Sequence, residues 1–187
     1  MILDAISKGI HMINNILETL MVGGELSRFD RGYKYGCDYG YILYHDSEVV
    51  TIRDYDQDGI YQGLRIFRTS QIESVGWNGN NMVARTKIIH KVGINADPVD
   101  VDITSFDAFL DTVNEKYGYV VVSNDRDEIA WRGPLIAHDS AFIHMINLGS
   151  PNRMDRTSCL IRKESVTSLS VDGVYERNLT MLHDGTL

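Results

Sequence analysis

The sequence predicts a mainly β fold made of two small five-stranded barrels in tandem, each preceded by a helix. Two observations lead to this prediction. The first is an internal repeat of about 93 residues that covers the whole 187-residue chain. The second is that each repeat opens on an amphipathic helical pattern and continues with short runs rich in Val, Ile, Tyr and Thr. One helix followed by five short antiparallel strands is typical of a small, strongly bent barrel.

The repeat is clearest where the two halves align without a gap. GYILYHDSEVVTIRD at residues 40–54 lies over GPLIAHDSAFIHMIN at 133–147, so the tripeptide HDS occurs twice, 93 residues apart. Further along, IFRTSQIESV at 66–75 lies over LIRKESVTSL at 160–169 with an offset of 94. Solenoid repeats are shorter, about 20–50 residues, so this length indicates tandem domains.

The boundary between the repeats is expected near the turn-rich stretch GINADP, which gives domains over residues 1–93 and 94–187. Each domain opens on a predicted helix. Residues 2–22 carry Ile and Leu at spacings of three and four, which places one apolar stripe along a helix. Residues 105–117 show the same kind of stripe, with Thr104 as the expected N-cap.

Five short strands are expected after each helix. β-branched and aromatic residues are enriched in these runs, and Gly, Asn and Asp separate them. In the first repeat the expected strands lie near residues 25–29, 33–44, 48–54, 61–75 and 82–89. In the second repeat they lie near residues 119–123, 127–137, 141–147, 157–169 and 174–182.

The composition limits the partners and the compartment. The net charge is −8 and the pI about 5.1, which argues against DNA as a partner because non-specific DNA binding needs a basic surface. The charge divides unevenly, with −1 on the first repeat and −7 on the second. No apolar run approaches the roughly 18–20 residues of a membrane span. Cys37 and Cys159 belong to no disulfide or zinc pattern. We therefore expect a cytoplasmic protein without cofactor, metal or membrane partner.

The HDS tripeptide contains the residue types of a hydrolase triad, but a triad needs three side chains that converge in space. Consecutive residues on an extended chain point to alternate sides. HDS therefore predicts a tight turn between the second and third strands, in which Asp and Ser bond nearby backbone N–H groups. No nucleophile–base pair or phosphate-binding loop stands out elsewhere, so the sequence does not predict an enzyme.

Two further patterns resemble parts of metal sites. DYDQDG at residues 54–59 matches the opening of a calcium loop, but the twelfth position of that loop is Arg65, where calcium needs a carboxylate. We expect an exposed hairpin loop there. His138 and His144 could face one another across the second HDS turn, but no third ligand stands at a recognisable spacing.

Both repeats resemble the Sm-like (LSm) family. The first motif of that family resembles G-x-L-x-x-[FY]-D-x-x-M-N. In this chain Gly40 is followed six residues later by Asp46, and Gly133 by Asp139, each before an apolar strand. The second motif resembles I-R-G-x-x-[IV]-x-x-[IVL], and it matches FRTSQIESV in the first repeat and IRKESVTSL in the second.

The resemblance implies an SH3-type barrel with an N-terminal helix in each repeat, and binding of single-stranded RNA. Mapped residue by residue, the candidate RNA-binding positions are Asp46, Arg68, Asp139, Phe142 and Arg162. The family also forms rings by pairing the fourth strand of one unit with the fifth strand of the next. We therefore expect self-association into a homo-oligomeric ring, with three chains giving six barrels.

Two departures from the family pattern leave a second function open. The Asn of the first motif falls on Val50 and Ile143, and the Gly of the second falls on Thr69 and Lys163. These departures, together with the acidic second repeat, favour a protein-interaction or scaffold ring that no longer binds RNA. The two motif arginines are also compatible with a structural role beside the adjacent loop.

Overall fold

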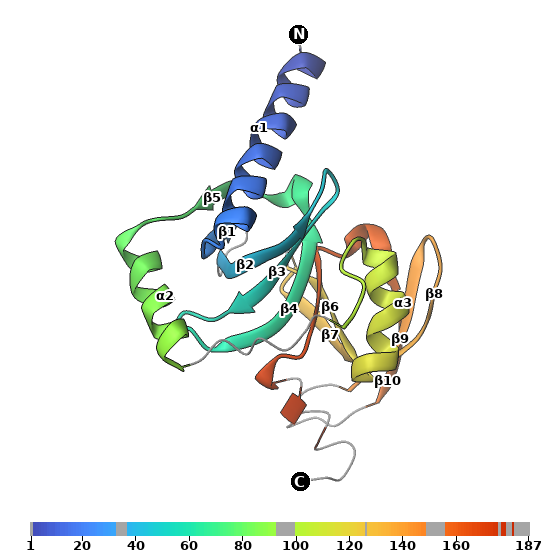
Figure 1. Cartoon of the computed structure of the whole chain (residues 1–187). Helices are drawn as coiled ribbons and strands as arrows, with labels where there is room; N and C mark the ends of the chain where they lie inside the picture. The colour runs from blue at the N-terminus through green and yellow to red at the C-terminus, as the bar shows by residue number, and fades with distance from the viewer. Residues whose placement is uncertain are drawn as a thin grey trace.

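The computed structural model describes most of the chain, and for residues 2–11 it describes the backbone alone. The described residues are 2–32, 37–92, 100–125, 127–148, 156–175, 177–178 and 181. The fold is mainly β, as expected, and its strands form one sheet of eight strands and one of three (Figure 1). The GINADP stretch, where the domain boundary is expected, lies outside the described residues.

The first repeat forms one helix, five strands and a second helix. In chain order these are α1 (Ile2–Gly23), β1 (Ser27–Asp30), β2 (Cys37–His45), β3 (Val49–Tyr55), β4 (Tyr61–Arg68), the 3-10 turn η1 (Thr69–Gln71), β5 (Ser74–Gly76) and α2 (Asn80–Val92). The strands lie in the order β5-β1-β2-β3-β4, and all neighbours are antiparallel.

The second repeat begins in the same way. Its elements are α3 (Phe106–Tyr117), β6 (Val120–Asn124), β7 (Ile129–Gly133), β8 (Leu135–His138), β9 (Phe142–Asn147), β10 (Thr157–Arg162), the 3-10 turn η2 (Lys163–Ser165) and β11 (Ser168–Val171). β11 pairs with β6 and β6 with β7, while β8, β9 and β10 form the smaller sheet. The backbone N–H of Leu148 bonds the carbonyl of Arg132 at 2.7 Å, which ties the end of β9 to β7.

The register of the strands follows the repeat in the sequence. Phe29 on β1 lies opposite Val75 on β5. Its counterpart Val122 on β6 lies opposite Leu169 on β11. Adding 93 to the residue number in β1, and 94 to the residue number in β5, gives the counterpart in the second repeat. The Phe29–Val75 pair then becomes the Val122–Leu169 pair. The duplication therefore extends from the sequence to the pairing of the strands.

The two repeats are joined through an antiparallel pairing of β4 with β11. Leu169 lies opposite Ile66, and Val171 lies opposite Leu64. The close approach needs Gly63, whose φ is +99° and where a Cβ would lie only 1.9 Å from the carbonyl oxygen of Val171. This pairing produces the continuous sheet β5-β1-β2-β3-β4-β11-β6-β7.

The described strands do not close into barrels. The larger sheet ends at β5 and β7, and the smaller sheet ends at β10 and β8. The mainly β class is confirmed, as is a helix at the start of each repeat. The two five-stranded barrels stay a prediction.

Several predicted boundaries were wrong. Residues 82–89 form part of helix α2 and no strand, because Met82, Arg85 and Ile89 are buried at the helical spacings of three and four. Within 174–182, the described residues that carry an assigned element are also helical. The fifth strands are instead β5 and β11, which the 3-10 turns separate from β4 and β10.

Helix α3 begins one residue later than expected. Its N-cap is Ser105, whose side chain accepts a hydrogen bond from the backbone N–H of Ala108, and not Thr104 as expected. The side chain of Asp102 holds Thr104 instead, because Asp102 Oδ1 accepts from both the backbone N–H and the hydroxyl of that residue.

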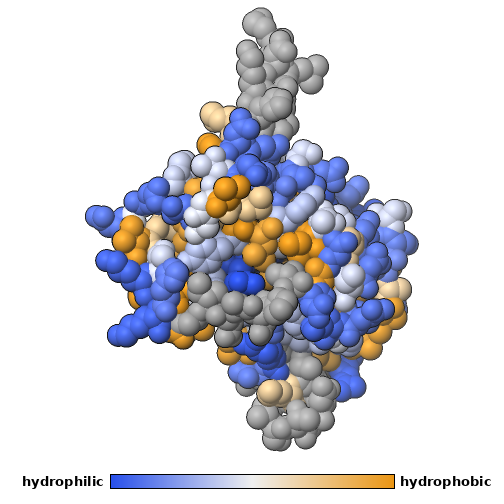
Figure 2. Space-filling view, in the orientation of Figure 1, coloured by the Kyte–Doolittle hydropathy of each residue, from blue (hydrophilic) through white to orange (hydrophobic). Residues whose placement is uncertain are grey.

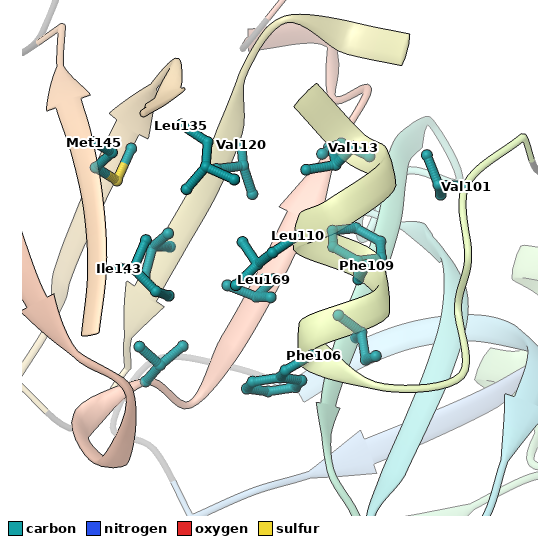
Figure 3. Packing of buried hydrophobic residues seen from close by; sticks show 14 of the residues in the cluster. Val101, Phe106, Phe109, Leu110, Val113, Val120, Leu135, Ile143, Met145 and Leu169 are labelled. Carbon is teal, nitrogen blue, oxygen red and sulfur yellow. The ribbon is translucent and has the colours of Figure 1, made fainter. Parts of the chain in front are cut away.

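Three hydrophobic clusters form the core of the described residues, and one of them spans both repeats. In the first cluster Leu17 and Leu20 of α1 pack over strands β1 to β4. In the second, α3 covers the strands of its own repeat, and Leu110 points toward Leu169 (Figure 3). Val49, Leu64 and Ile66 of the first repeat belong to this second cluster. The repeats therefore share a core as well as a sheet. The N-terminal part of α1 extends beyond this body (Figure 1).

Equivalent glycines lie within β2 of the first repeat and at the end of β7 in the second. A Cβ on Gly40 would lie 2.5 Å from the carbonyl oxygen of Arg53. A Cβ on Gly133, where φ is +150°, would lie 2.0 Å from that of Ile146. Both glycines are the first residue of the first motif, so that motif position is explained by close contact between neighbouring strands.

We expect Gly133→Ser to lower the free energy of unfolding by about 2 kcal/mol or more, because the side chain meets backbone and the φ is strained. Gly79→Ser is the matched control, since nothing lies within 4 Å of a Cβ there. Its effect should stay within about 0.5 kcal/mol. Urea unfolding of the two variants measures the difference, and equal losses would contradict this account.

Candidate functional site

Each HDS tripeptide lies in a tight turn, between β2 and β3 in the first repeat and between β8 and β9 in the second. In both turns Oδ1 of the aspartate accepts hydrogen bonds from the backbone N–H groups two and three residues further on. The distances are 2.7 and 2.8 Å for Asp46, and 2.7 Å for both bonds of Asp139. These N–H donors hold the pKa of the Asp139 carboxyl below its usual range. The aspartates therefore shape the turns, as the sequence predicted.

The histidines of the two tripeptides contact the helix of their own repeat. Nε2 of His45 lies 3.0 Å from Oε2 of Glu18 on α1. Nε2 of His138 lies 2.8 Å from Oδ1 of Asp111 on α3. Each pair is separated by 27 residues, so the contact is duplicated as well. His and Asp of HDS thus have different partners, which agrees with a structural turn and not with a triad.

The two motif arginines end β4 and β10, next to these turns. The guanidinium of Arg162 lies 4.9 Å from the ring centroid of Phe142, which is opposite it on β9. The guanidinium of Arg68 lies 4.8 Å from the ring of Phe106 on α3. Arg162 is exposed and Arg68 is half-buried. One stack therefore forms within the second repeat, and the other links the first repeat to the second.

The positions that depart from the family pattern offer no open polar group. Val50 and Ile143 are both 0% exposed and belong to the core. Lys163, which stands at the glycine position, is nearly buried and forms an ion pair with Asp107 of α3. Its Nζ also lies 3.2 Å from Nδ1 of His138. A base that entered here would not find the amide that the family pattern supplies.

The five candidate residues form two groups around the start of α3. We name Asp46 and Arg68 the first turn cluster, and Asp139, Phe142 and Arg162 the second turn cluster. Phe106 of α3 contacts the first cluster through Arg68. The next residue, Asp107, pairs with Lys163 beside the second cluster. Sequence reasoning missed both helix residues, because no motif marks them and their partners are distant in sequence.

The histidines and the DYDQDG loop, which resemble parts of metal sites in the sequence, have hydrogen-bond partners within the protein. Nε2 of His144 lies 2.8 Å from the hydroxyl of Ser158, whereas His138 contacts α3. In the DYDQDG loop, Oδ1 of Asp56 accepts two backbone N–H bonds and Oδ2 accepts one from Gln62, so this carboxylate holds the hairpin loop together. Among the described residues, no three His, Cys, Asp or Glu side chains are placed to hold a metal ion.

A polar cleft of about 670 Å³, which the sequence did not predict, lies where the two repeats meet. Within it Nε of Arg65 lies 2.8 Å from Oδ2 of Asp54 and 3.5 Å from Oδ1 of Asp38. Burial raises the pKa of the Asp54 carboxyl to about 6, against the opposing effect of Arg65. Next to the cleft, Arg31 is 2.6 Å from Asp38 and 3.1 Å from Asp125 of the second repeat.

This ion network is a feature of the junction between repeats. Oδ2 of Asp125 also accepts hydrogen bonds from the hydroxyls of Thr167 and Ser168, next to and within β11. The charged side chains come from the ends of separate strands, so no local sequence pattern could bring them together. The Arg31–Asp125 ion pair links the two repeats next to the β4–β11 strand pair.

Comparisons with known proteins give no relative on which to base a function. No protein-family model, no curated protein and no solved structure matches the chain. In the part of the chain that is described, no helix has the length and apolar character needed to cross a membrane.

We expect Asp139→Ala to lower the urea midpoint of unfolding, because two backbone N–H groups lose their acceptor. Asp139→Asn is the matched control, since its side-chain oxygen still accepts. Because the folded-state pKa of Asp139 is lowered, this stabilisation is present at neutral pH and is lost as the pH falls through that pKa. The midpoints of wild type and Asp139→Ala should therefore converge in acid. Equal midpoints at neutral pH would contradict the structural role of this turn.

Proposed function

We propose that this protein consists of two divergent Sm-like units that assemble into a ring of three chains, and that the ring binds single-stranded RNA. The observation that carries the proposal is the pairing of β4 with β11. It joins the fourth strand of one repeat to the last strand of the other, which is the contact that links units in rings of the family.

The order of the strands gives further support. The first repeat runs β5-β1-β2-β3-β4, with a 3-10 turn between β4 and β5. The second repeat follows the same sequence of pairings if β7 and β8 are taken as one strand interrupted after Gly133. Among the described strands, β5 has a neighbour only in β1, and β10 only in β9. Two unpaired outer edges favour addition of further chains.

The second turn cluster supports RNA as the ligand. The exposed guanidinium of Arg162 and the ring of Phe142 form a flat, cationic and aromatic surface. Such a surface stacks on unpaired bases, because every base presents a π face and the guanidinium also attracts phosphate. Three chains in a ring would present three such clusters to one strand of RNA.

A second candidate, a protein-interaction ring without RNA, is favoured by burial and charge. The base-recognising Asn positions are occupied by Val50 and Ile143, both fully buried. The second repeat carries a net charge of −7, which repels a polyanion. An intact ring that binds no RNA would favour this candidate over the first.

For the assembly, we expect a particle of about 64 kDa, which is three chains of 21.2 kDa each. The reason is that unpaired β edges and exposed apolar side chains at both ends gain stability by pairing. Light scattering coupled to size-exclusion chromatography at micromolar protein measures the mass. A monomer of 21.2 kDa at this concentration would overturn the ring.

For RNA, we expect Arg162→Ala to weaken binding of a short U-rich strand about tenfold, since one stacked base is worth roughly 1–3 kcal/mol. Lys87→Ala is the matched control, because it removes one positive charge from the exposed side of α2. Fluorescence anisotropy at low salt measures both affinities. Absence of binding by the wild-type oligomer, or equal losses in the two variants, would contradict RNA binding at this cluster.

A further inference from the structure

The junction inside the chain shows how one repeat buries the edge of the other. In the β4–β11 pairing, Leu169 lies opposite Ile66 and Val171 lies opposite Leu64. All four side chains are between 0 and 2% exposed. Each also belongs to the cluster that α3 covers, so the edge pairing and the core packing form together.

The counterparts of these four positions stand exposed or half-buried at the two free edges. Offsets of 94 relate Leu169 to Val75 on β5 and Val171 to Trp77 just after it. The same offset relates Ile66 to Leu160 on β10 and Leu64 to Ser158, which is polar and exposed. Leu160 is 67% exposed and Trp77 is 41% exposed, whereas their counterparts at the internal junction are fully buried. At three of the four positions the free edges therefore carry apolar side chains whose counterparts are buried at the internal junction.

A groove lies beside Trp77, at the free end that corresponds through the repeat to the internal junction. It has a volume of about 260 Å³ and lies between α1 and Trp77, lined by Met12, Asn15, Ile16, Thr19, Leu20 and Trp77. The counterparts of Ile16 and Leu20 on α3 are Phe109 and Val113, both 0% exposed. These share their cluster with side chains of the first repeat. Figure 2 shows one face of the molecule, on which apolar areas lie among larger hydrophilic ones.

The other free end carries side chains of the right kind to fill that groove. At the internal junction, Leu43 and Ile66 of the first repeat pack on the second-repeat cluster. Their counterparts are Ile136 on β8 and Leu160 on β10. Ile136 is 52% exposed and Leu160 is 67% exposed. One end of the chain thus presents an apolar groove and the other end presents two exposed apolar side chains.

We infer that the groove between α1 and Trp77 receives Ile136 and Leu160 of a second copy of this chain. β5 of one chain then runs antiparallel to β10 of the next, with Val75 opposite Leu160 and Gly76 opposite Cys159. This inference rests on the proposed ring and specifies its interface between chains. The register is obtained by applying the repeat offset to the observed β4–β11 pairs.

The interface between chains differs chemically from the internal junction. At the internal junction Arg65 pairs with Asp54 and Asp38. Cys159, Asn147 and Trp131 stand at the counterparts of these three positions. The contact between chains therefore lacks that ion network and depends on apolar burial. Because salt screens charge pairs and strengthens apolar association at most weakly, the oligomer is expected to persist in about 1 M NaCl.

The test is a disulfide between chains. Gly76→Cys is introduced together with Cys37→Ser, which leaves the new thiol and Cys159. A Cβ at Gly76 fits, since its nearest neighbour is Cβ of Arg28 at 3.9 Å. Directly opposed residues in an antiparallel pair have Cα atoms about 4.5–5.5 Å apart, within the range that a disulfide spans. Mild oxidation should therefore link chains covalently, as seen on a non-reducing gel.

The matched control is Ser74→Cys in the same background, because the inferred register puts this position opposite Ile161, two residues from Cys159. We expect roughly tenfold less cross-linked chain for it than for Gly76→Cys. As a second measurement, Leu160→Asp should reduce the particle to a monomer by light scattering. Ile60→Asp, on an exposed loop residue of the first repeat, should leave the particle mass unchanged.

The outcomes separate this inference from the ring itself. A wild-type oligomer with no cross-link in Gly76→Cys, or with Leu160→Asp still assembled, overturns the interface and leaves the ring standing. Stronger cross-linking of Ser74→Cys than of Gly76→Cys overturns the register. A monomeric wild type overturns both. An oligomer that binds no RNA but forms the Gly76→Cys cross-link supports the interface and overturns only the RNA ligand.

Discussion

The rest of the structure depends on the antiparallel pairing of β4 with β11. An unpaired β4 would leave a row of backbone N–H and C=O groups open along one side. With β11 in place, Val49, Leu64 and Ile66 of the first repeat enter the core that α3 covers. Gly63 makes the approach possible, because any side chain there would collide with the backbone of β11. The strand pair thus enlarges the core of the second repeat with side chains of the first.

The two repeats share the features that define the fold and differ in those that would define a ligand. The aspartate turn, the histidine–helix contact, the glycine of the first motif and the 3-10 turn occur in both. The arginine stacks differ, since Arg68 packs on Phe106 of the other repeat and Arg162 on Phe142 of its own. Because Arg68 is half-buried against Phe106, the second turn cluster is the one with an exposed arginine.

The sequence predicted what depends on local pattern and on the repeat. The helical stripes and the HDS turns follow from spacing and turn chemistry. The prediction failed for α2, because one of its three buried positions is Arg85, whose charge breaks the apolar stripe. The guanidinium of Arg85 lies over Tyr39 and donates to the carbonyl of Asp56, contacts that no local pattern reveals. The network of Arg31, Asp38 and Asp125 was missed for the same reason, since its members are distant in sequence.

The difference between the internal junction and the proposed contact between chains has a thermodynamic reason. Burying charged groups costs desolvation energy that their pairing only partly repays. The internal junction can bear this cost because its two halves are tethered, so their effective concentration is high. A contact between separate chains has no such help and must also offset the loss of translational freedom. Apolar side chains such as Leu160 and Trp77 gain more on burial for the same area than a network of buried ion pairs does. An ion network beside the apolar junction within the chain, and none at the proposed contact between chains, is therefore the arrangement expected of a fused pair of units.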